Sequence, residues 1–508
     1  MSHTWNVDRA EAHIERKIAD VETVEIFTYK RDLKLENIPT NRAYRVDGVH
    51  LYADILNVEE MLNATVVESE RVHQRLLRFI NLQYRAFDRI LNRTEVRRVD
   101  FQNQRLHALV TRPFGTDKEA DRVHRAVAVA QLAIDVLDQT GDAEQQLPDA
   151  KVRVGIDSGE TLAVNNGRNG GREPLFLGDA ANHGAKMACG GQAAGIYLTN
   201  RARTAIGLDE VDNPKRTPLT TKEIAVSQNA ADLGVSVETL VEEWHADLKK
   251  NPLGSIEFSG HTPPLRTLDI TALTLANSRR QDAVSIYADL DGFTAYVARH
   301  IEDRPEDVVR VLHVLRAELD RVLVREFDGR RIRFIGDCIH GLMCEGTART
   351  TDAEASITDA TLCAGALRSS FDLALQKLKD EDIDVAGLGL QIGFEYGPVT
   401  VTRMGLHGDR VRCSISRSVL ESEAEQGRCG ASETAIGEAA WTAASEGVQD
   451  LFGSDRKVAD LDYAEAVDAL AESGDKKAST AQAAAYVAAA PAVAAAAPAV
   501  VRPYADDK

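Results

Sequence analysis

The sequence contains one pattern twice, and this internal repeat limits the possible folds more than any other feature. Four motifs of the first copy, YAD, RRVDF, LHALV and VGIDSG, return in the same order as YAD, RRIRF, IHGLM and IGFEYG. They begin at residues 52, 97, 106 and 154 in the first copy and at residues 287, 330, 339 and 392 in the second. The offset between matched motifs changes only slightly along the chain. Such a series indicates a tandem duplication with changes in loop length.

Stretches with apolar residues at helical spacing lie between the repeated motifs. They cover residues 68–91 and 119–138 in the first copy, and residues 304–327 and 358–378 in the second. Each copy therefore predicts the order strand, helix, strand, turn, strand, helix, strand. This order predicts an α+β fold in which helices cover one face of a mixed sheet.

The repeats divide the chain into four predicted segments. Residues 45–205 and 280–440 are the two repeated domains, and residues 206–279 form a partly helical connector that ends in a late hairpin. Residues 455–508 become acidic and then rich in Ala and Pro. We expect this last segment to be a low-complexity, disordered tail.

Composition excludes several classes of protein. A hydrophobic content of 44% and a charged content of 27% are typical of a globular protein. The chain has no apolar run of membrane-spanning length and no signal-peptide pattern, so we expect a cytoplasmic protein without a membrane partner. Its six scattered cysteines predict reduced thiols. A net charge of −19 argues against a nucleic-acid partner. It is compatible with a small polyphosphate substrate whose charge metal ions screen.

Two aspartates of the second copy are candidate metal ligands. Asp289 ends the VSIYAD strand, and Asp337 lies at the tip of the hairpin in RRIRFIGDCIHGLM. If these strands are neighbours, both carboxylates converge, with the carbonyl of Leu290 beside them. Such a set of hard oxygen atoms suits Mg²⁺ or Mn²⁺, completed by substrate phosphates.

These motifs resemble the metal-binding signature of the class III nucleotide cyclases. YADLDGFT, which holds Asp289, and RIRFIGDC, which holds Asp337, carry the resemblance, and it covers residues 45–205 and 280–435. It implies two ferredoxin-like βαββαβ domains and two metal ions, Mg²⁺ or Mn²⁺, held by these aspartates. Asp291 matches a variable position of the family, so we expect it to be structural.

The family builds its active site between two catalytic domains, and the first copy carries the complementary residues. In LFLGDAANHGAKM, Asn182 and Lys186 match the family's transition-state Asn and Arg, one helical turn apart. Lysine keeps the charge of arginine but lacks its bidentate fork. The first copy has Gln104 at the second metal position, and the second copy has Leu420 and Ala424 where the Asn and the basic residue belong.

The resemblance therefore implies one complete composite site in an intramolecular pseudo-heterodimer, so that a monomer could be active. The implied reaction converts a nucleoside triphosphate into a 3′,5′-cyclic monophosphate and pyrophosphate. Asp100 and Leu175 occupy the base-reading positions of the family. A carboxylate accepts hydrogen bonds, so the pair disfavours ATP and leaves GTP, CTP and UTP. Gln391 stands where the family has a triphosphate-binding Arg.

The chain is also similar to the pyrimidine cyclases of Pycsar antiphage systems. This similarity favours cUMP or cCMP as the product, acting on a separate effector protein. The alternatives are a guanylate or adenylate cyclase in bacterial signalling, and an inactive nucleotide sensor. A relative of diguanylate cyclases is disfavoured because no GGDEF-like turn is present.

Overall fold

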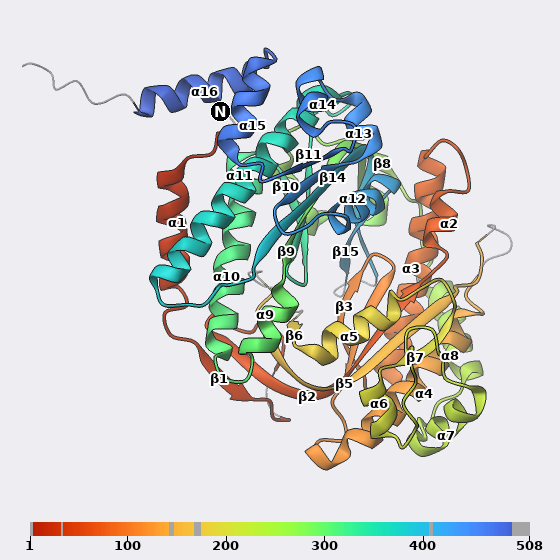
Figure 1. Ribbon diagram of the computed structural model, residues 1–508. Coiled ribbons are helices and arrows are strands. Elements are labelled where there is room, and N and C mark those ends of the chain that lie inside the picture. The colour runs from red at the N-terminus through yellow and green to blue at the C-terminus, as the bar shows by residue number, and fades with distance from the viewer. Residues whose placement is uncertain (1–3, 32–33, 142–146, 167–173, 406–409, 490–508) are drawn as a thin grey trace, which may run out of the picture.

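Each copy of the repeat folds into one βαββαβ unit, as the order of motifs predicts. The structure is a computed structural model that describes residues 4–31, 34–141, 147–166, 174–405 and 410–489 (Figure 1). The first unit comprises β2 (Arg42–Ile55), α3 (Glu70–Arg93), β3 (Arg97–Gln102), β4 (Arg105–Val110), α4 (Glu119–Leu137) and β5 (Val152–Val164). The second comprises β9 (Ser278–Asp291), α10 (Pro305–Arg321), β10 (Arg330–Ile335), β11 (Cys338–Met343), α11 (Ala353–Asp380) and β14 (Gly389–Met404). The predicted α+β fold with two tandem βαββαβ domains is confirmed.

The two sheets have the same central order. In the seven-stranded sheet of the first unit, the order is β3-β4-β2-β5-β6, where β6 is Leu175–Leu177. In the eight-stranded sheet of the second unit, it is β10-β11-β9-β14-β16-β17, where β16 is Glu433–Ile436 and β17 is Lys457–Ala459. The longest pairings are antiparallel, between β2 and β5 and between β9 and β14. They place the ends of the two central strands at equivalent points of the two units.

The duplication extends to local backbone geometry. The β3–β4 hairpin turns through Asn103 at φ 50°, and the β10–β11 hairpin turns through Gly336 at φ 60°. Glycine and asparagine are the residues that adopt this left-handed conformation most readily. The register of each hairpin also shifts at the same place, after Arg98 in one and after Arg331 in the other.

The two units share their hydrophobic cores. Ala43, Leu162 and Val164 of the first unit are buried in the core of the second, together with Leu177 of β6. Met404 and three residues of β15 (Val411–Ile415) are buried in turn in the core of the first unit. This reciprocal exchange makes the pairing of the units part of the folded core.

The connector is helical as expected, but its late hairpin is not formed. Helices α7 (Thr221–Ala231) and α8 (Val237–Lys250) pack on α4. The following β8 (Phe258–Ser259) pairs with β9 in the parallel direction, and short 3₁₀ turns follow it. Pro263 and Pro264 explain the difference, because proline has no N–H with which to continue an antiparallel ladder.

The expected tail from residue 455 is corrected in its first part. Residues 457–489 form β17, α15 (Tyr463–Glu472) and α16 (Lys476–Ala489). Helix α15 packs on α11 through the buried Ala466 and Leu470, and Lys477 Nζ lies 2.6 Å from Asp359 Oδ2. Apolar residues at helical spacing thus fold where overall composition indicated low complexity. Residues 490–508, which hold most of the Ala/Pro-rich sequence, lie outside the described residues.

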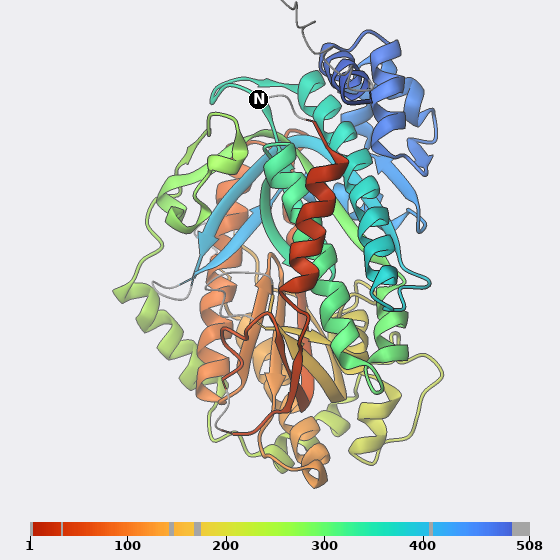
Figure 2. The same ribbon diagram turned by 90° about the vertical axis from the view of Figure 1, so that its left-hand side faces the viewer.

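The N-terminal helix α1 (Val7–Ala19) packs on the second unit although it precedes the first. Figure 2 shows α1 alongside α10 and α11. Ile14 is fully buried there, and His13 Nδ1 lies 2.6 Å from the buried Glu318 Oε2. Helices α1 and α15, which lie far apart in the sequence, therefore both cover the helical layer of the second unit.

No helix in the described part of the chain is long and apolar enough to span a bilayer.

Candidate active site

The two predicted metal aspartates of the second unit lie on neighbouring strands. Strand β11 pairs with β9 so that Ile339 faces Ala288. Continuing this antiparallel register places Cys338 opposite Asp289, with Asp337 directly before it in the hairpin turn. Leu290 follows Asp289 with its side chain buried, so that only its carbonyl can serve a ligand. The strand register thus places the two carboxylates close together, with Leu290 next to Asp289 in the chain.

Burial and repulsion by neighbouring carboxylates dominate the electrostatics of these two aspartates, and the charge of Arg316 offsets only part of the effect on Asp337. Burial and the charge of Asp291 raise the pKa of Asp289 to about 6. Burial and the charge of Asp289 raise the pKa of Asp337 well above its ordinary value. Among the described residues, no group of three or more His, Cys, Asp or Glu side chains could hold a metal ion. Two adjacent carboxylates that disfavour ionisation fit a divalent cation whose remaining ligands are phosphate oxygens and water.

Asp291, the last residue of β9, is held by the side chain of Gln391. Gln391 Nε2 donates to Asp291 Oδ1 at 2.9 Å, and Gln426 Nε2 donates to Gln391 Oε1 at 2.7 Å. Gln391, at the position of the family's triphosphate Arg, thus links the strand end to α12 (Arg417–Gly427). These bonds give Asp291 and Gln391 a structural role.

Helix α5 (Asp179–Ala188) carries the predicted Asn182 and Lys186. It lies close against β5 because Gly155 has no side chain: a Cβ there would meet the Gly184 carbonyl oxygen at 2.3 Å. Asn182 is half-buried, and its Nδ2 lies 3.5 Å from Thr294 Oγ1 in the DGFT segment of the second unit. Lys186 lies one turn further along and is exposed.

Asn182 therefore reaches the first turn of the helix that follows Asp289 in the chain. Figure 1 shows α5 beside α9 (Phe293–His300), the helix that begins in the DGFT segment. The contact with Thr294 was not foreseen, although the resemblance placed both motifs at one site.

A cavity of about 250 Å³ opens between the two units at this point. The first unit contributes Asp100, Leu175 and Asn182 to its wall. The second unit contributes Phe334, Ile335 and Gly336 of the β10–β11 hairpin, which we call the metal hairpin because it carries Asp337. The cavity thus joins the predicted base-reading residues to the hairpin that carries Asp337. This cavity is where we expect the composite site that the complementary motifs implied.

Asp100 is the charged base-reading candidate in this cavity. Its Oδ2 lies 3.4 Å from Nη1 of Arg333, a residue of the second unit. Its Oδ1 is buried and has no hydrogen-bond partner among the described residues. A buried carboxylate oxygen without a donor is costly, and a substrate N–H can supply that donor.

The pseudo-symmetric twin of the site is closed by an arginine. Arg105 faces Asp54 across β2 and β4, with Nε 3.5 Å from Asp54 Oδ1. Its Nη1 lies 2.9 Å from Oε1 of Glu423 on α12 of the second unit. Burial raises the pKa of Asp54, and the Arg105 charge opposes that rise. Asp54 belongs to the YAD motif of the first copy and is the counterpart of Asp289. A guanidinium thus neutralises this carboxylate where the other unit carries a candidate metal ligand. No sequence motif pointed to Arg105.

His107 and His340 occupy equivalent positions of the repeat and pack against tyrosines in the two sheets. His107 stacks on Tyr52 with ring centroids 4.1 Å apart, and His340 stacks on Tyr287 at 4.3 Å. Burial lowers the pKa of His340 to about 3 and that of His107 well below its ordinary value. Both imidazoles are therefore neutral parts of the sheets.

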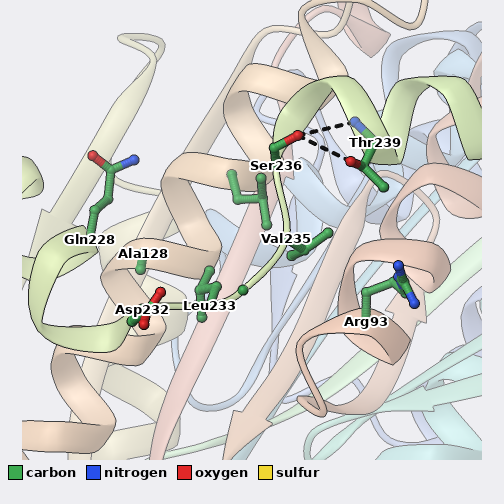
Figure 3. Close-up of a pocket in the computed structure, with 10 residues that line it drawn as sticks. Arg93, Ala128, Gln228, Asp232, Leu233, Val235, Ser236 and Thr239 are labelled. Carbon is green, nitrogen blue, oxygen red and sulfur yellow. Dashed lines mark hydrogen bonds between the residues drawn. The ribbon is translucent and has the colours of Figure 1, made fainter.

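A second cavity, of about 620 Å³, lies between α3, α4 and the connector helices (Figure 3). Ser236 caps α8 at its edge by accepting a hydrogen bond from the Thr239 N–H at 3.2 Å. Arg93, also at this cavity, lies 3.1 Å from Glu243. These groups satisfy one another, so the cavity between the units remains the candidate active site.

The paired βαββαβ units and their composite site define a nucleotide cyclase of class III. The adenylate and guanylate cyclase catalytic domain family matches residues 44–224 and 276–436. The chain belongs to this family.

Individual relatives are similar over most of the chain. A uridylate cyclase of Pseudomonas aeruginosa is 60% identical over 476 residues, 93% of each chain. A uridylate cyclase of a Rhizobium species is 38% identical over 435 residues, 82% of each chain. The crystal structure of a class III adenylyl cyclase-like ATP-binding protein from Pseudomonas aeruginosa superimposes with a TM-score of 0.91 at 59% identity. The match covers 92% of this chain and 100% of that one.

Proposed function

We propose that the chain is a uridylate cyclase, which converts UTP into 3′,5′-cyclic UMP and pyrophosphate. The ribose 3′-oxygen attacks the α-phosphorus, the bond from that phosphorus to the bridging oxygen of the β-phosphate breaks, and the 3′-hydroxyl proton passes to solvent. Pyrophosphate leaves with the electron pair of the broken bond. Positioning and charge stabilisation supply most of the catalysis in such a transfer.

The observation that carries the base assignment is the buried, unpartnered Oδ1 of Asp100. Uracil presents its N3–H as a donor, whereas adenine and cytosine present an acceptor ring nitrogen on the same edge. Leu175 adds an apolar surface in place of a polar partner for an exocyclic amino group. The two relatives described above as uridylate cyclases support the same choice.

Asn182 and Lys186 are the proposed catalytic residues. Asn182 lines the cavity and can hold the ribose in line for attack. Its side chain contacts Thr294 of α9. Lys186, on the same face of α5, can meet the charge that develops on the phosphoryl oxygens. Because a lysine side chain has rotatable bonds and a point charge, its exposed position is compatible with closing on substrate.

Asp289, Asp337 and the Leu290 carbonyl are the proposed holders of two ions, Mg²⁺ or Mn²⁺. When bound, these ions supply charge neutralisation for the triphosphate and acidify the ribose hydroxyl. Asp289 at the end of β9 and Asp337 in the β10–β11 turn would hold these ions. The raised pKa values of both carboxylates fit this role, because a cation reverses the penalty of ionising them.

One assay tests the proposal. Purified protein is incubated with each of the four nucleoside triphosphates and Mn²⁺, and products are identified by mass spectrometry. We expect cyclic UMP from UTP, and a loss of about 10³-fold or more in Asp289→Asn, because a charged metal ligand is removed. Asp282→Asn, an exposed position of the same strand, is the matched control and should keep activity within about twofold.

Each other outcome of this assay contradicts a defined part of the proposed function. No cyclic product from any nucleotide would leave a nucleotide sensor without turnover as the function. ATP as the preferred substrate would overturn the role of Asp100 and Leu175 and agree with the ATP-binding description of the similar crystal structure. Cyclic CMP or cyclic GMP as the main product would keep the cyclase and change the base.

We further propose that the product is a signal in antiphage defence and acts on a separate effector protein. The support is the family resemblance of a tandem pyrimidine cyclase. The test is phage challenge of cells that carry the gene with its genomic neighbours. Protection should require Asp289, and equal protection by Asp289→Asn would contradict this role.

A further inference from the structure

The pair Asp100–Arg333 crosses the boundary between the two units at the wall of the cavity. Asp100 is the fourth residue of RRVDF on β3, and Arg333 is the fourth residue of RRIRF on β10, so they are equivalent positions of the repeat. In both hairpins the register shifts just before this position. Such a bulge re-aims the side chain that follows it. The duplication thus gave one position two opposite charges that meet across the pseudo-symmetry axis.

Arg333 is fixed more firmly than an ordinary ion-pair partner. It is 3% exposed, and its Nη1 donates to the Phe101 carbonyl oxygen at 2.7 Å. Its Nη2 donates to the Arg412 carbonyl oxygen on β15. Because main-chain atoms of both units hold the guanidinium plane, the position of its charge is independent of side-chain flexibility.

Only one of the two Asp100 carboxylate oxygens has a partner among the described residues. Oδ2 lies 3.4 Å from Arg333 Nη1, whereas Oδ1 is buried without a donor. A carboxylate that one cation holds by one oxygen has little freedom to rotate, and its second oxygen then points in a defined direction.

Arg333 also lies on β10, the first strand of the β10–β11 hairpin that carries Asp337. Phe334, Ile335 and Gly336 line the cavity, and Asp337 follows them. The residue that fixes the carboxylate of one unit therefore belongs to the same hairpin as the metal ligand of the other.

We propose that Arg333 is a specificity-determining positioning residue. It holds Asp100 Oδ1 toward the base. The first unit can then distinguish uracil, which has an N3–H donor, from cytosine, which has an N3 acceptor. This discrimination requires that the metal-binding unit is docked. This inference rests on the proposed uridylate cyclase activity and adds to it that base selection depends on a residue of the metal-binding unit.

The test compares Arg333→Met with Arg331→Met. Arg331 lies on the same strand but pairs with Asp320 at 2.8 Å, so its loss leaves Asp100 in place. Equimolar UTP and CTP are supplied with Mn²⁺, and the ratio of cyclic UMP to cyclic CMP is measured with KM and kcat for UTP. We expect Arg333→Met to raise KM for UTP at least tenfold, to lower the product ratio at least tenfold, and to change kcat less than threefold. Arg331→Met should stay within twofold of wild type in the product ratio.

Two further variants guard against a merely structural effect. Asp100→Asn should lower the product ratio as Arg333→Met does, and the double variant should show no additional change. Arg333→Lys keeps the charge without the planar fork and should fall between wild type and Arg333→Met, even if Arg333→Met fails to fold. Equal product ratios and equal KM values in Arg333→Lys and wild type, together with an additive double variant, would overturn the proposal.

Thermal-shift measurements with each nucleotide distinguish a failure of the inference about Arg333 from a failure of the proposed uridylate cyclase activity. If wild type binds UTP without turnover, the stabilisation by UTP over CTP should still be lost in Arg333→Met. If wild type shows no preference between UTP and CTP in either assay, Arg333 selects no base and the inference is wrong. If wild type prefers UTP and Arg333→Met does so equally, only the inference about Arg333 is wrong.

Discussion

At the scale of single residues, Asp289 and Asp337 should oppose the folding of the metal-free protein. Their pKa values are raised in the folded state, so folding favours their protonated forms. The stability they contribute is full below the unfolded pKa of about 4 and is lost as pH rises through the folded pKa, which is about 6 for Asp289 and well above the ordinary value for Asp337. Metal-free wild type should therefore lose stability between pH 4 and pH 8.

Asp337→Asn tests this conflict between stability and function. In EDTA at pH 8, we expect the variant to be more stable than wild type by about 1 to 3 kcal/mol, because one of two repelling charges is gone. Mn²⁺ should raise Tm in wild type and leave the variant unchanged, while cyclase activity is lost in the variant. The measurement is thermal unfolding with and without metal. A variant less stable than wild type in EDTA would contradict the assignment of these carboxylates as an incompletely compensated pair.

His340 should make the folded protein less stable as the pH becomes acidic. Burial lowers its pKa to about 3, so the unfolded chain binds a proton that the folded chain refuses. Its contribution is present above pH 6.5 and is lost as pH falls toward 3, by about 1.4 kcal/mol per pH unit. His340→Gln should make the loss of Tm between pH 6.5 and pH 5 less steep. His245→Gln, on an exposed position of α8, is the control and should leave the slope unchanged.

At the scale of elements, helix α1 should stabilise the metal-binding unit although it belongs to the other end of the chain. Ile14 is fully buried against α10 and α11, whereas Ala12 on the same helix is exposed. Ile14→Asp should lower stability by about 3 kcal/mol or more, because an unpaired charge replaces a core side chain. Ala12→Asp should change it by about 0.5 kcal/mol at most. Denaturant unfolding compares the two, and equal effects would show that α1 contributes little.

Elements also show what sequence patterns can predict and what they cannot. The βαββαβ order of each unit was predictable because apolar periodicity and hairpin turns are local signals. Helix α1 was not assigned, because the helices it packs on belong to the second unit, far along the chain. The late hairpin predicted at the end of the connector failed at Pro263 and Pro264, and α15 was hidden in a segment judged by composition.

The residues of the candidate site likewise include some that sequence motifs predicted and some that they missed. Motif spacing identified Asp289, Asp337 and Asn182 as candidates, and the structure places them around one junction. Arg105 and Arg333 escaped notice because each acts on a residue of the opposite unit. Only the docking of the units decides which charges meet. Aligning the two copies position by position would have revealed that Asp100 and Arg333 are equivalent and oppositely charged.

At the scale of the whole molecule, the two units form a dimer that cannot be symmetric. One interface position supplies Asp100 in the first unit and Arg333 in the second, so pairing two like units would oppose two like charges. The twin site is filled by Arg105, Asp54 and Glu423. The exchanged core residues join the units as well. One nucleotide should therefore bind per chain.

A mixing experiment tests whether the active site lies within one chain. Asp337→Asn removes a metal ligand from the second unit, and Asn182→Ala removes the ribose-positioning group from the first. If the site forms inside one chain, a mixture of the two variants has only the summed residual activities, at any concentration. If two chains exchanged units, mixed dimers would contain one intact site and activity would rise with protein concentration. We expect no recovery, because separating the units would expose the shared cores, and the hydrophobic cost of that exposure exceeds the marginal stability of a folded domain.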